Sequence, residues 1–338
     1  MKHLEECIQK LMDDKLLENI AVKVGRYDED ICELYRSKNG SINELTLFDM
    51  ASVSKIVSTT SLALIALDRG LMSLDDSPAD FFDFECGEDQ KNLKIRNLLT
   101  HTITIPNSRI NMPGVTQDNV AEFILKEKDI KPGTEFRYSC VSFILLQKIV
   151  EKLLGNSQDV LFSELVCKPL GMTHTCYNPQ DKSNIVNSNM TDEEIGLVND
   201  FNSRFLGGVA GNAGVFSNMK DMTLFAKGLL KGLPFVSKET FDMATKDYIP
   251  HSSMGRGLGY IHVDERFAQT GGLFSNGSIG HCGHTGQSVF ADRNTGLYTI
   301  ILSDATLWTT KKYGVDDYDN IMKMREDLHG AIKKDLGI

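Results

Sequence analysis

Short apolar stretches near both ends of the chain have the length and composition of β-strands. Four of them stand out: 20–25, 31–35, 288–291 and 297–302. Polar turns at 26–30 and 292–296 join them in pairs, which predicts two hairpins. Residues 1–15 and 318–334 place apolar positions at helical spacing. We therefore expect both chain ends to form one antiparallel sheet flanked by helices.

The middle of the chain follows a helical pattern instead. Its apolar positions recur every three or four residues, or fill whole segments, in 52–67, 119–126, 140–154 and 219–230. Glycine, proline and asparagine separate these segments. The pattern predicts an α+β fold, with a sheet lobe from 1–50 and 245–338 and a mostly helical lobe from 51–244. We expect the cleft of an active site where the two lobes meet.

Composition and charge narrow the class of protein. The 338 residues are 41% hydrophobic, enough for a sizeable core, and the formal charge is -10 without a run of lysine or arginine. Such a surface does not favour nucleic acid or anionic membranes as partners, and no apolar run approaches a membrane span or a signal-peptide core. Seven cysteines without regular spacing are typical of free thiols. We expect a cytoplasmic protein that acts on a small molecule without a cofactor, and the pattern predicts no oligomeric state.

Ser52 stands three residues before Lys55, at the start of an apolar segment that ends at Gly70. In a helix, positions three apart share one face, so the hydroxyl lies beside the amine. A serine hydroxyl becomes an effective nucleophile when a base takes its proton, and a lysine with a lowered pKa can be that base. Backbone N–H groups at the helix N-terminus can also bind a developing oxyanion. The two residues together indicate acyl-transfer chemistry.

The same spacing recurs at Ser217 and Lys220, so spacing alone does not identify a nucleophile. Ser217 follows a glycine-rich stretch and opens a helical segment, where serine is a favoured N-cap. We expect a capping role for Ser217. The distinction between the two serines depends on the residues that accompany each of them.

Several further segments accompany Ser52 in a fixed order. They are 98–102 (LLTHT), 138–140 (YSC), 168–173 (KPLGMT), 207–217 (GGVAGNAGVFS) and 280–286 (GHCGHTG). Together with the Ser-Val-Ser-Lys run they resemble, over roughly residues 18–305, the penicillin-binding proteins and class C β-lactamases. The resemblance implies hydrolysis of a short ester, D-alanyl peptide or β-lactam through an acyl-enzyme. It implies that Ser52 is the nucleophile, Lys55 the amine that shares its proton, and Tyr138 the proton relay or general base.

One departure from that family lies in the tyrosine motif. Its third residue is usually an asparagine, whose amide can bind both the lysine and a substrate carbonyl, whereas here it is Cys140. A thiol is a weak hydrogen-bond donor and acceptor. We expect weaker recognition of a peptide-like amide, and we interpret Cys140 as a small buried residue that opens a helix rather than as a nucleophile.

The third motif allows two registers. Residues 284–286 (HTG) match by letters, but relatives tend to read Gly-His-Thr-Gly-x-Thr-Gly before the strand, which aligns with 280–286 and is the register we prefer. In that register His281 is the cation of the motif, Cys282 replaces a threonine that binds substrate carboxylates, and Gly283 is the motif glycine. The N–H of His284 then joins that of the nucleophile in the oxyanion hole.

Other interpretations stay open. His281, Cys282 and His284 have side chains that ligate zinc, but adjacent strand residues point to opposite faces and no fourth ligand is evident, so we expect no metal. The cysteines at Cys140 and Cys282 are compatible with a slow or inactive penicillin-binding sensor module. Transfer of the acyl group to an acceptor other than water is a third interpretation. His101 we interpret as structural.

Overall fold

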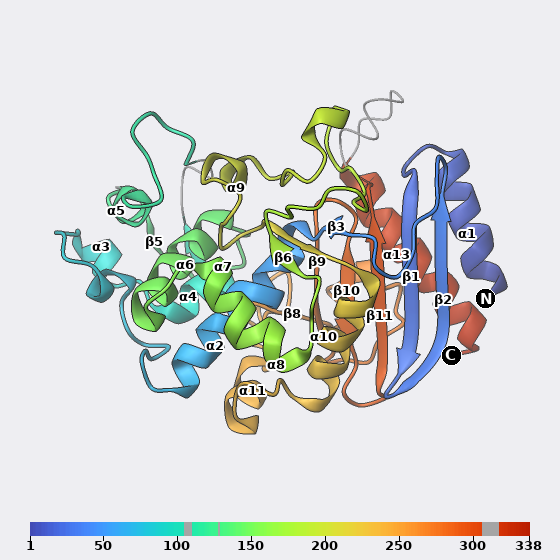
Figure 1. The fold of residues 1–338 in the computed structure, drawn as a ribbon. Helices are drawn as coiled ribbons and strands as arrows, with labels where there is room; N and C mark the ends of the chain where they lie inside the picture. Colours follow the sequence, from blue (N-terminus) through green and yellow to red (C-terminus); the bar gives the residue numbers. More distant parts are fainter. Residues whose placement is uncertain (105–109, 128, 306–317) are drawn as a thin grey trace.

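The centre of the molecule is a six-stranded antiparallel sheet that joins strands from both chain ends, in the order β2-β1-β11-β10-β9-β8. The computed structural model describes residues 1–104, 110–127, 129–305 and 318–338. The strands of this sheet are β1 (Asn19–Arg26), β2 (Glu29–Ser37), β8 (Ile261–His262), β9 (Ile279–Cys282), β10 (Ser288–Ala291) and β11 (Leu297–Ser303). The predicted α+β arrangement, with a sheet formed by both ends, is confirmed (Figure 1).

Helices cover both faces of this sheet. On one face, α1 (Lys2–Asp13) packs against α13 (Tyr318–Leu336), and their apolar side chains share a cluster with Ile20 and Val22 of β1. Ala21 belongs to the larger cluster on the opposite face, because successive strand residues alternate. There α10 (Met219–Lys231) packs against β10 and β11. This helix falls within the range predicted for the helical lobe, yet it packs against the sheet.

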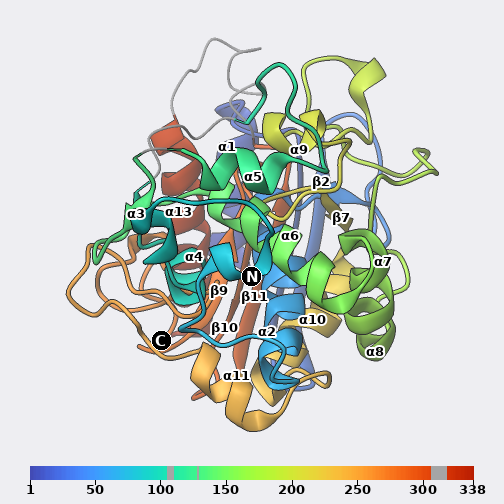
Figure 2. The same ribbon diagram turned by 90° about the vertical axis from the view of Figure 1, so that its left-hand side faces the viewer.

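The middle of the chain is mostly helical, as its periodicity predicted (Figure 2). Its helices are α2 (Ser61–Asp68), α3 (Glu88–Lys91), α4 (Ile95–Thr100), α5 (Val120–Leu125), α6 (Cys140–Leu154), α7 (Gln158–Phe162), α8 (Lys168–Leu170), α9 (Phe201–Phe205) and α11 (Lys238–Ala244). Two small sheets lie among them: β3 (Phe48–Asp49), β7 (Val215–Ser217) and β6 (Cys176–Tyr177), and the pair β4 (Ile103–Thr104) and β5 (Lys131–Pro132).

A helical segment over 51–68 runs through the core. It begins with a 3-10 turn at Ala51–Val53, continues as a π-helix at Lys55–Thr60 and ends as α2, where the pattern predicted one helix over 52–67. We expected no apolar run long enough to span a membrane, but the segment 51–68 is long and apolar enough for one. Inside the protein 83% of this segment is buried, which is also typical of a core helix. Its first turn contacts β9. The segment therefore begins where the sheet meets the helices.

Candidate active site

Ser52 and Lys55 meet at the start of this central segment. The Lys55 Nζ lies 3.0 Å from the Ser52 Oγ and donates to the carbonyl oxygen of Asn212 at 2.8 Å. Ser52 is partly exposed, whereas Lys55 is fully buried. The π-helical stretch is anchored by Thr59, whose hydroxyl donates to the Gly211 carbonyl at 2.7 Å. Such stretches occur frequently at functional sites. The structure places the hydroxyl beside the amine, as the spacing predicts.

The second serine–lysine pair has a different environment. Ser217 ends β7, and its hydroxyl shares a 2.7 Å hydrogen bond with that of Thr175. The helix that follows is capped by Asn218, whose side chain accepts from the Asp221 N–H at 2.9 Å. The prediction that Ser217 caps this helix is therefore wrong by one residue, because the strand extends through it. Lys220 is exposed, so this pair does not reproduce the buried contact between hydroxyl and amine.

Tyr138 reaches the same hydroxyl from another element. It lies on the loop before α6, and its hydroxyl donates to the Ser52 Oγ across 2.6 Å. Its ring centre lies 4.9 Å from the Lys55 Nζ and 4.6 Å from that of His101. His101 is fully buried, and its Nδ1 accepts from the Ser139 N–H at 3.1 Å. The interpretation of His101 as structural agrees with this bond, but the ring also packs against the tyrosine that contacts Ser52.

The titratable groups around Ser52 are coupled to one another. Burial lowers the pKa of the Lys55 ammonium, but its interactions with Cys140 and Tyr138 raise it, and the net direction is upward. Burial raises the pKa of the Tyr138 phenol, and the charge of Lys55 opposes this effect. Once Lys55 and Tyr138 together lose one proton, they form either an ammonium beside a phenolate or an amine beside a phenol. Either arrangement can accept the proton of Ser52.

Cys140 begins α6 and lies directly beside the lysine. Its Sγ is 3.7 Å from the Lys55 Nζ, a weak contact. Burial raises the pKa of the Cys140 thiol, which therefore stays protonated at neutral pH and is a poor nucleophile. A thiol at this place cannot supply the donor and the acceptor that an asparagine amide would.

Strand β9 brings one predicted residue toward the site and turns the next one away. His281 is 2% exposed, and its ring centre lies 6.3 Å from that of Tyr138. Cys282 packs against the apolar cluster that also contains side chains of α1 and α13. It therefore lies on the opposite face of the strand from His281, as alternation requires. The structure does not bring Cys282 to Ser52, contrary to the prediction that it lines the substrate site.

The positive charge beside His281 belongs to Arg256. Burial and the charges of Arg256 and Lys55 lower the pKa of His281 well below 6.5, which corrects the prediction of a cationic His281. Arg256 is 1% exposed, with its Nη2 3.5 Å from the His281 Nε2, and its Nε has no hydrogen-bond partner among the described residues. Burial lowers the pKa of Arg256 to about 10, so it stays charged at neutral pH. No sequence pattern distinguishes this buried arginine from an exposed one.

Gly283 and His284 lie in the turn between β9 and β10. This turn packs against the start of the central segment: a Cβ on Gly283 would lie 2.8 Å from the Met50 carbonyl oxygen and 3.2 Å from the Ala51 Cβ. A glycine is therefore required for the two backbones to approach this closely. The turn that contains His284 lies directly against the backbone that leads into Ser52.

The zinc interpretation receives no support from the described part of the chain. Among these residues, no group of three or more histidine, cysteine, aspartate or glutamate side chains lies close enough together to hold a metal ion. His281 and Cys282, two of the three candidate ligands, lie on opposite faces of β9. The seven cysteines of the chain are all free thiols in the structure.

Comparison with known proteins identifies the family to which this chain is similar. The family model described as Beta-lactamase matches residues 4–321. A protein of Escherichia coli (strain K12) described as "Putative D-alanyl-D-alanine carboxypeptidase" is 27% identical over 299 residues, which cover 77% of this chain and 69% of the relative.

Two solved structures share the fold. The octameric penicillin-binding protein homologue from Pyrococcus abyssi has a TM-score of 0.77 at 19% identity, covering 99% of this chain and 77% of that one. EstCE1, described as a hydrolase with promiscuous acyltransferase activity, has a TM-score of 0.76 at 20% identity, covering 97% of this chain and 98% of that one. The predicted β-lactamase and transpeptidase fold is confirmed. Because the family model spans nearly the whole chain, the protein belongs to the beta-lactamase family.

Proposed function

We propose that the protein is a serine hydrolase that cleaves an ester or amide through an acyl-enzyme on Ser52. One observation carries the proposal: the Lys55 Nζ and the Tyr138 hydroxyl converge on the Ser52 Oγ from separate elements, at 3.0 and 2.6 Å. Acyl transfer requires a nucleophile with proton-accepting and proton-donating groups within hydrogen-bond distance. The names of the relatives, a carboxypeptidase and a hydrolase, support the same class of reaction.

Acylation begins when the Ser52 Oγ attacks the substrate carbonyl carbon and passes its proton to Lys55 and Tyr138. The N–H groups of Ser52 and His284 stabilise the oxyanion of the tetrahedral intermediate. Tyr138 then protonates the leaving alcohol or amine, the C–O or C–N bond breaks, and an ester remains on Ser52.

Deacylation reverses these roles. Lys55 and Tyr138 take a proton from a water molecule, the resulting hydroxide attacks the acyl carbonyl, and Ser52 leaves with its proton restored. An alcohol or amine in the place of water would give acyl transfer, the activity named for the neighbour EstCE1. A sensor module would instead stop at the acyl-enzyme.

The substrate class follows from the charges at the edge of the site. Arg256 places a buried positive charge next to His281, and no carboxylate forms an ion pair with it among the described residues. Its positive potential favours a substrate that carries a carboxylate near the scissile bond. We infer a small carboxylate-bearing ester or amide, such as a D-alanyl peptide. With the expected cytoplasmic location, a recycled cell-wall peptide fits better than cross-linked peptidoglycan.

Labelling with a fluorophosphonate probe, followed by intact mass measurement, tests the nucleophile. We expect one adduct on the wild type, none on Ser52→Ala, and an undiminished adduct on Ser217→Ala, which removes the matched serine. An unlabelled wild type, or a Ser52→Ala variant that labels as well as wild type, contradicts the proposal. Multiple turnovers of a short p-nitrophenyl ester exclude a sensor module. Product analysis with added amines or alcohols separates transfer from hydrolysis.

A further inference from the structure

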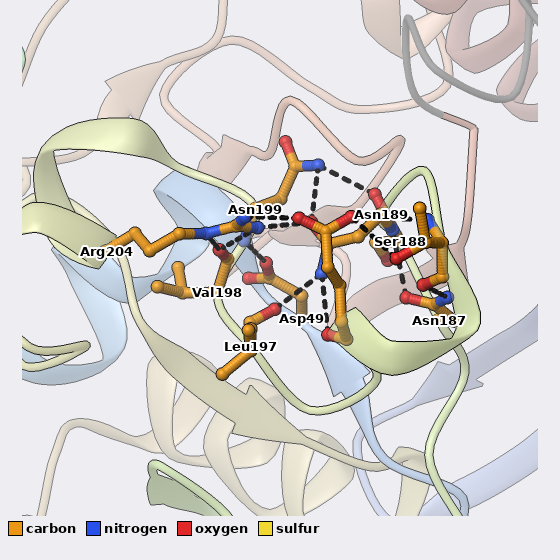
Figure 3. A network of polar contacts seen from close by, with 10 residues as sticks. Asp49, Asn187, Ser188, Asn189, Leu197, Val198, Asn199 and Arg204 are labelled. Atoms are coloured by element: carbon orange, nitrogen blue, oxygen red, sulfur yellow. Dashed lines mark hydrogen bonds and ion pairs between the residues drawn. The ribbon is translucent and has the colours of Figure 1, made fainter.

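Asp49 is a buried carboxylate that the proposed chemistry does not use. It ends β3, three residues before the nucleophile, and is 1% exposed. One carboxylate oxygen accepts the Ala51 N–H at 2.8 Å. The other accepts the Asn199 N–H at 2.7 Å (Figure 3). Arg204 belongs to the same network, but its ion pair is with Glu194. Burial raises the pKa of Asp49 to about 6. A carboxylate that is costly to bury therefore lies beside the active serine.

The bond to Ala51 closes a strained turn. Ala51 has a φ of 44°, in the left-handed region that residues with a Cβ seldom adopt. Such a conformation is unfavourable for a residue with a Cβ and persists only where its surroundings hold it in place. The Asp49 carboxylate accepts the N–H of this residue, which begins the 3-10 turn that contains Ser52. The carboxylate therefore fixes the backbone direction at the Ser52 N–H.

The main-chain carbonyl of Asp49 binds the turn on the other side of the site. It accepts hydrogen bonds from the Thr285 hydroxyl at 2.9 Å and from the Gln287 side-chain amide. Arg325 of α13 also contacts this turn, and its guanidinium donates to the carbonyl oxygens of Gly283 and Gln287. One residue thus contacts both backbone turns that border the nucleophile.

We propose that Asp49 is a positioning residue that fixes the separation between two oxyanion donors, the N–H groups of Ser52 and His284. The inference rests on the proposed function, because it assigns these N–H groups to the oxyanion hole. The Asp49 carboxylate sets the turn of one donor, and its carbonyl ties down the turn of the other. Oxyanion donors are effective only within about 2.7–3.1 Å of the developing charge. A small shift of either turn would therefore slow the reaction without weakening substrate binding.

Asp49→Asn tests this role, because it keeps the size of the side chain and converts one acceptor into an amide donor that faces a backbone N–H. We expect kcat for a short p-nitrophenyl ester to fall about 10- to 100-fold, with KM changed less than about threefold. The affinity for an aryl boronic acid should fall in parallel, because its tetrahedral adduct on serine resembles the oxyanion. A residue with a merely structural role would leave the boronate affinity of the folded protein unchanged.

Asp304→Asn is the matched control. Asp304 is 3% exposed and accepts the N–H groups of Glu18 and Asn19 at 2.9 and 3.0 Å, at the start of β1. We expect this variant to lose stability while its kcat stays at the wild-type value. An equal loss of kcat in both variants would overturn the proposal. So would unchanged kcat and boronate affinity in a folded Asp49→Asn.

If Asp49→Asn does not fold, Thr285→Val supplies an independent test. This isosteric change removes the donor to the Asp49 carbonyl and leaves the carboxylate in place. We expect kcat to fall several-fold with KM nearly constant, and an unchanged kcat would overturn the coupling. A wild type that the fluorophosphonate does not label refutes the proposed function itself. Labelling of the wild type together with unchanged variants refutes only the role of Asp49.

Discussion

The removal of one hydroxyl group tests the proposed mechanism most directly. Tyr138→Phe deletes the oxygen that lies 2.6 Å from the Ser52 Oγ and keeps the ring, with its contacts to His101 at 4.6 Å and to the Lys55 Nζ at 4.9 Å. Although its hydroxyl is desolvated within the site, the Tyr138 residue as a whole is 44% exposed, so the deletion leaves no sealed cavity. We expect the free energy of unfolding to change by no more than about 1 kcal/mol.

The effect on the reaction should be much larger than the effect on stability. A positioned general acid or base contributes about 10²- to 10⁴-fold to the rate, which corresponds to about 3–5 kcal/mol of transition-state stabilisation. The loss should appear in the acylation rate and not in the affinity for substrate, because the hydroxyl contacts Ser52 in the resting site.

Pre-steady-state release of p-nitrophenolate measures acylation by an ester whose leaving group needs no proton, so it reports the role of Tyr138 as base. A D-alanyl peptide also needs a proton on its leaving amine, which Tyr138 would supply. We therefore expect Tyr138→Phe to lower the acylation rate for the peptide about tenfold more than for the ester. Tyr27→Phe, at a 51% exposed position in the turn between β1 and β2, is the control and should keep both rates. A folded Tyr138→Phe with both rates within about threefold of wild type would refute the mechanism.

Two further predictions concern buried charged or titratable groups. Arg256→Met keeps an unbranched side chain and removes the guanidinium charge, so kcat/KM for a D-alanyl peptide should fall about tenfold while that for a neutral p-nitrophenyl ester is retained; equal losses on both would assign Arg256 a packing role. Burial lowers the pKa of His329 to about 4, and its Nε2 lies 3.0 Å from the Thr299 hydroxyl. Between that value and the ordinary value of 6.5 the unfolded chain binds more protons, so the free energy of unfolding should fall by about 3 kcal/mol as pH drops through this window. His329→Gln should lose this component in urea unfolding at neutral pH and close to pH 4, and an identical pH dependence in both proteins would contradict the assignment.

The parts of the fold that local pattern determines were predictable from the sequence. The sheet strands β1 and β11 are marked by short apolar stretches next to polar turns, and the helix α6 by a longer apolar stretch, and these local patterns need no knowledge of the partner. The contact between Ser52 and Lys55 follows from a spacing of three residues in a helix. Tyr138 was predictable only through the resemblance to a family, because its own surroundings resemble those of any packed tyrosine.

Features that depend on contacts between residues far apart in the sequence were harder to predict. Cys282 was expected to face the substrate, but a side chain on a strand changes face with each residue, so its direction depends on the register of β9 against β10. The charge state of His281 depends on Arg256, which lies on a different segment of the chain. The bond from Thr285 to the Asp49 carbonyl joins residues 236 positions apart, and neither residue has a local pattern that indicates it.

The catalytic groups and the groups that would recognise a substrate differ in how the fold places them. The groups proposed to perform the chemistry, Ser52, Lys55 and Tyr138, are placed by short spacings and by one loop, and they converge here in the fold of the family. The groups that would recognise a substrate depend on contacts between distant segments, as Arg256 does, and on single positions such as Cys140. At 27% identity, a shared fold and reaction class do not require shared groups for substrate recognition. The reaction class of the relatives therefore carries over to this chain more securely than their substrates do, and the peptide, ester and boronate assays test the two parts separately.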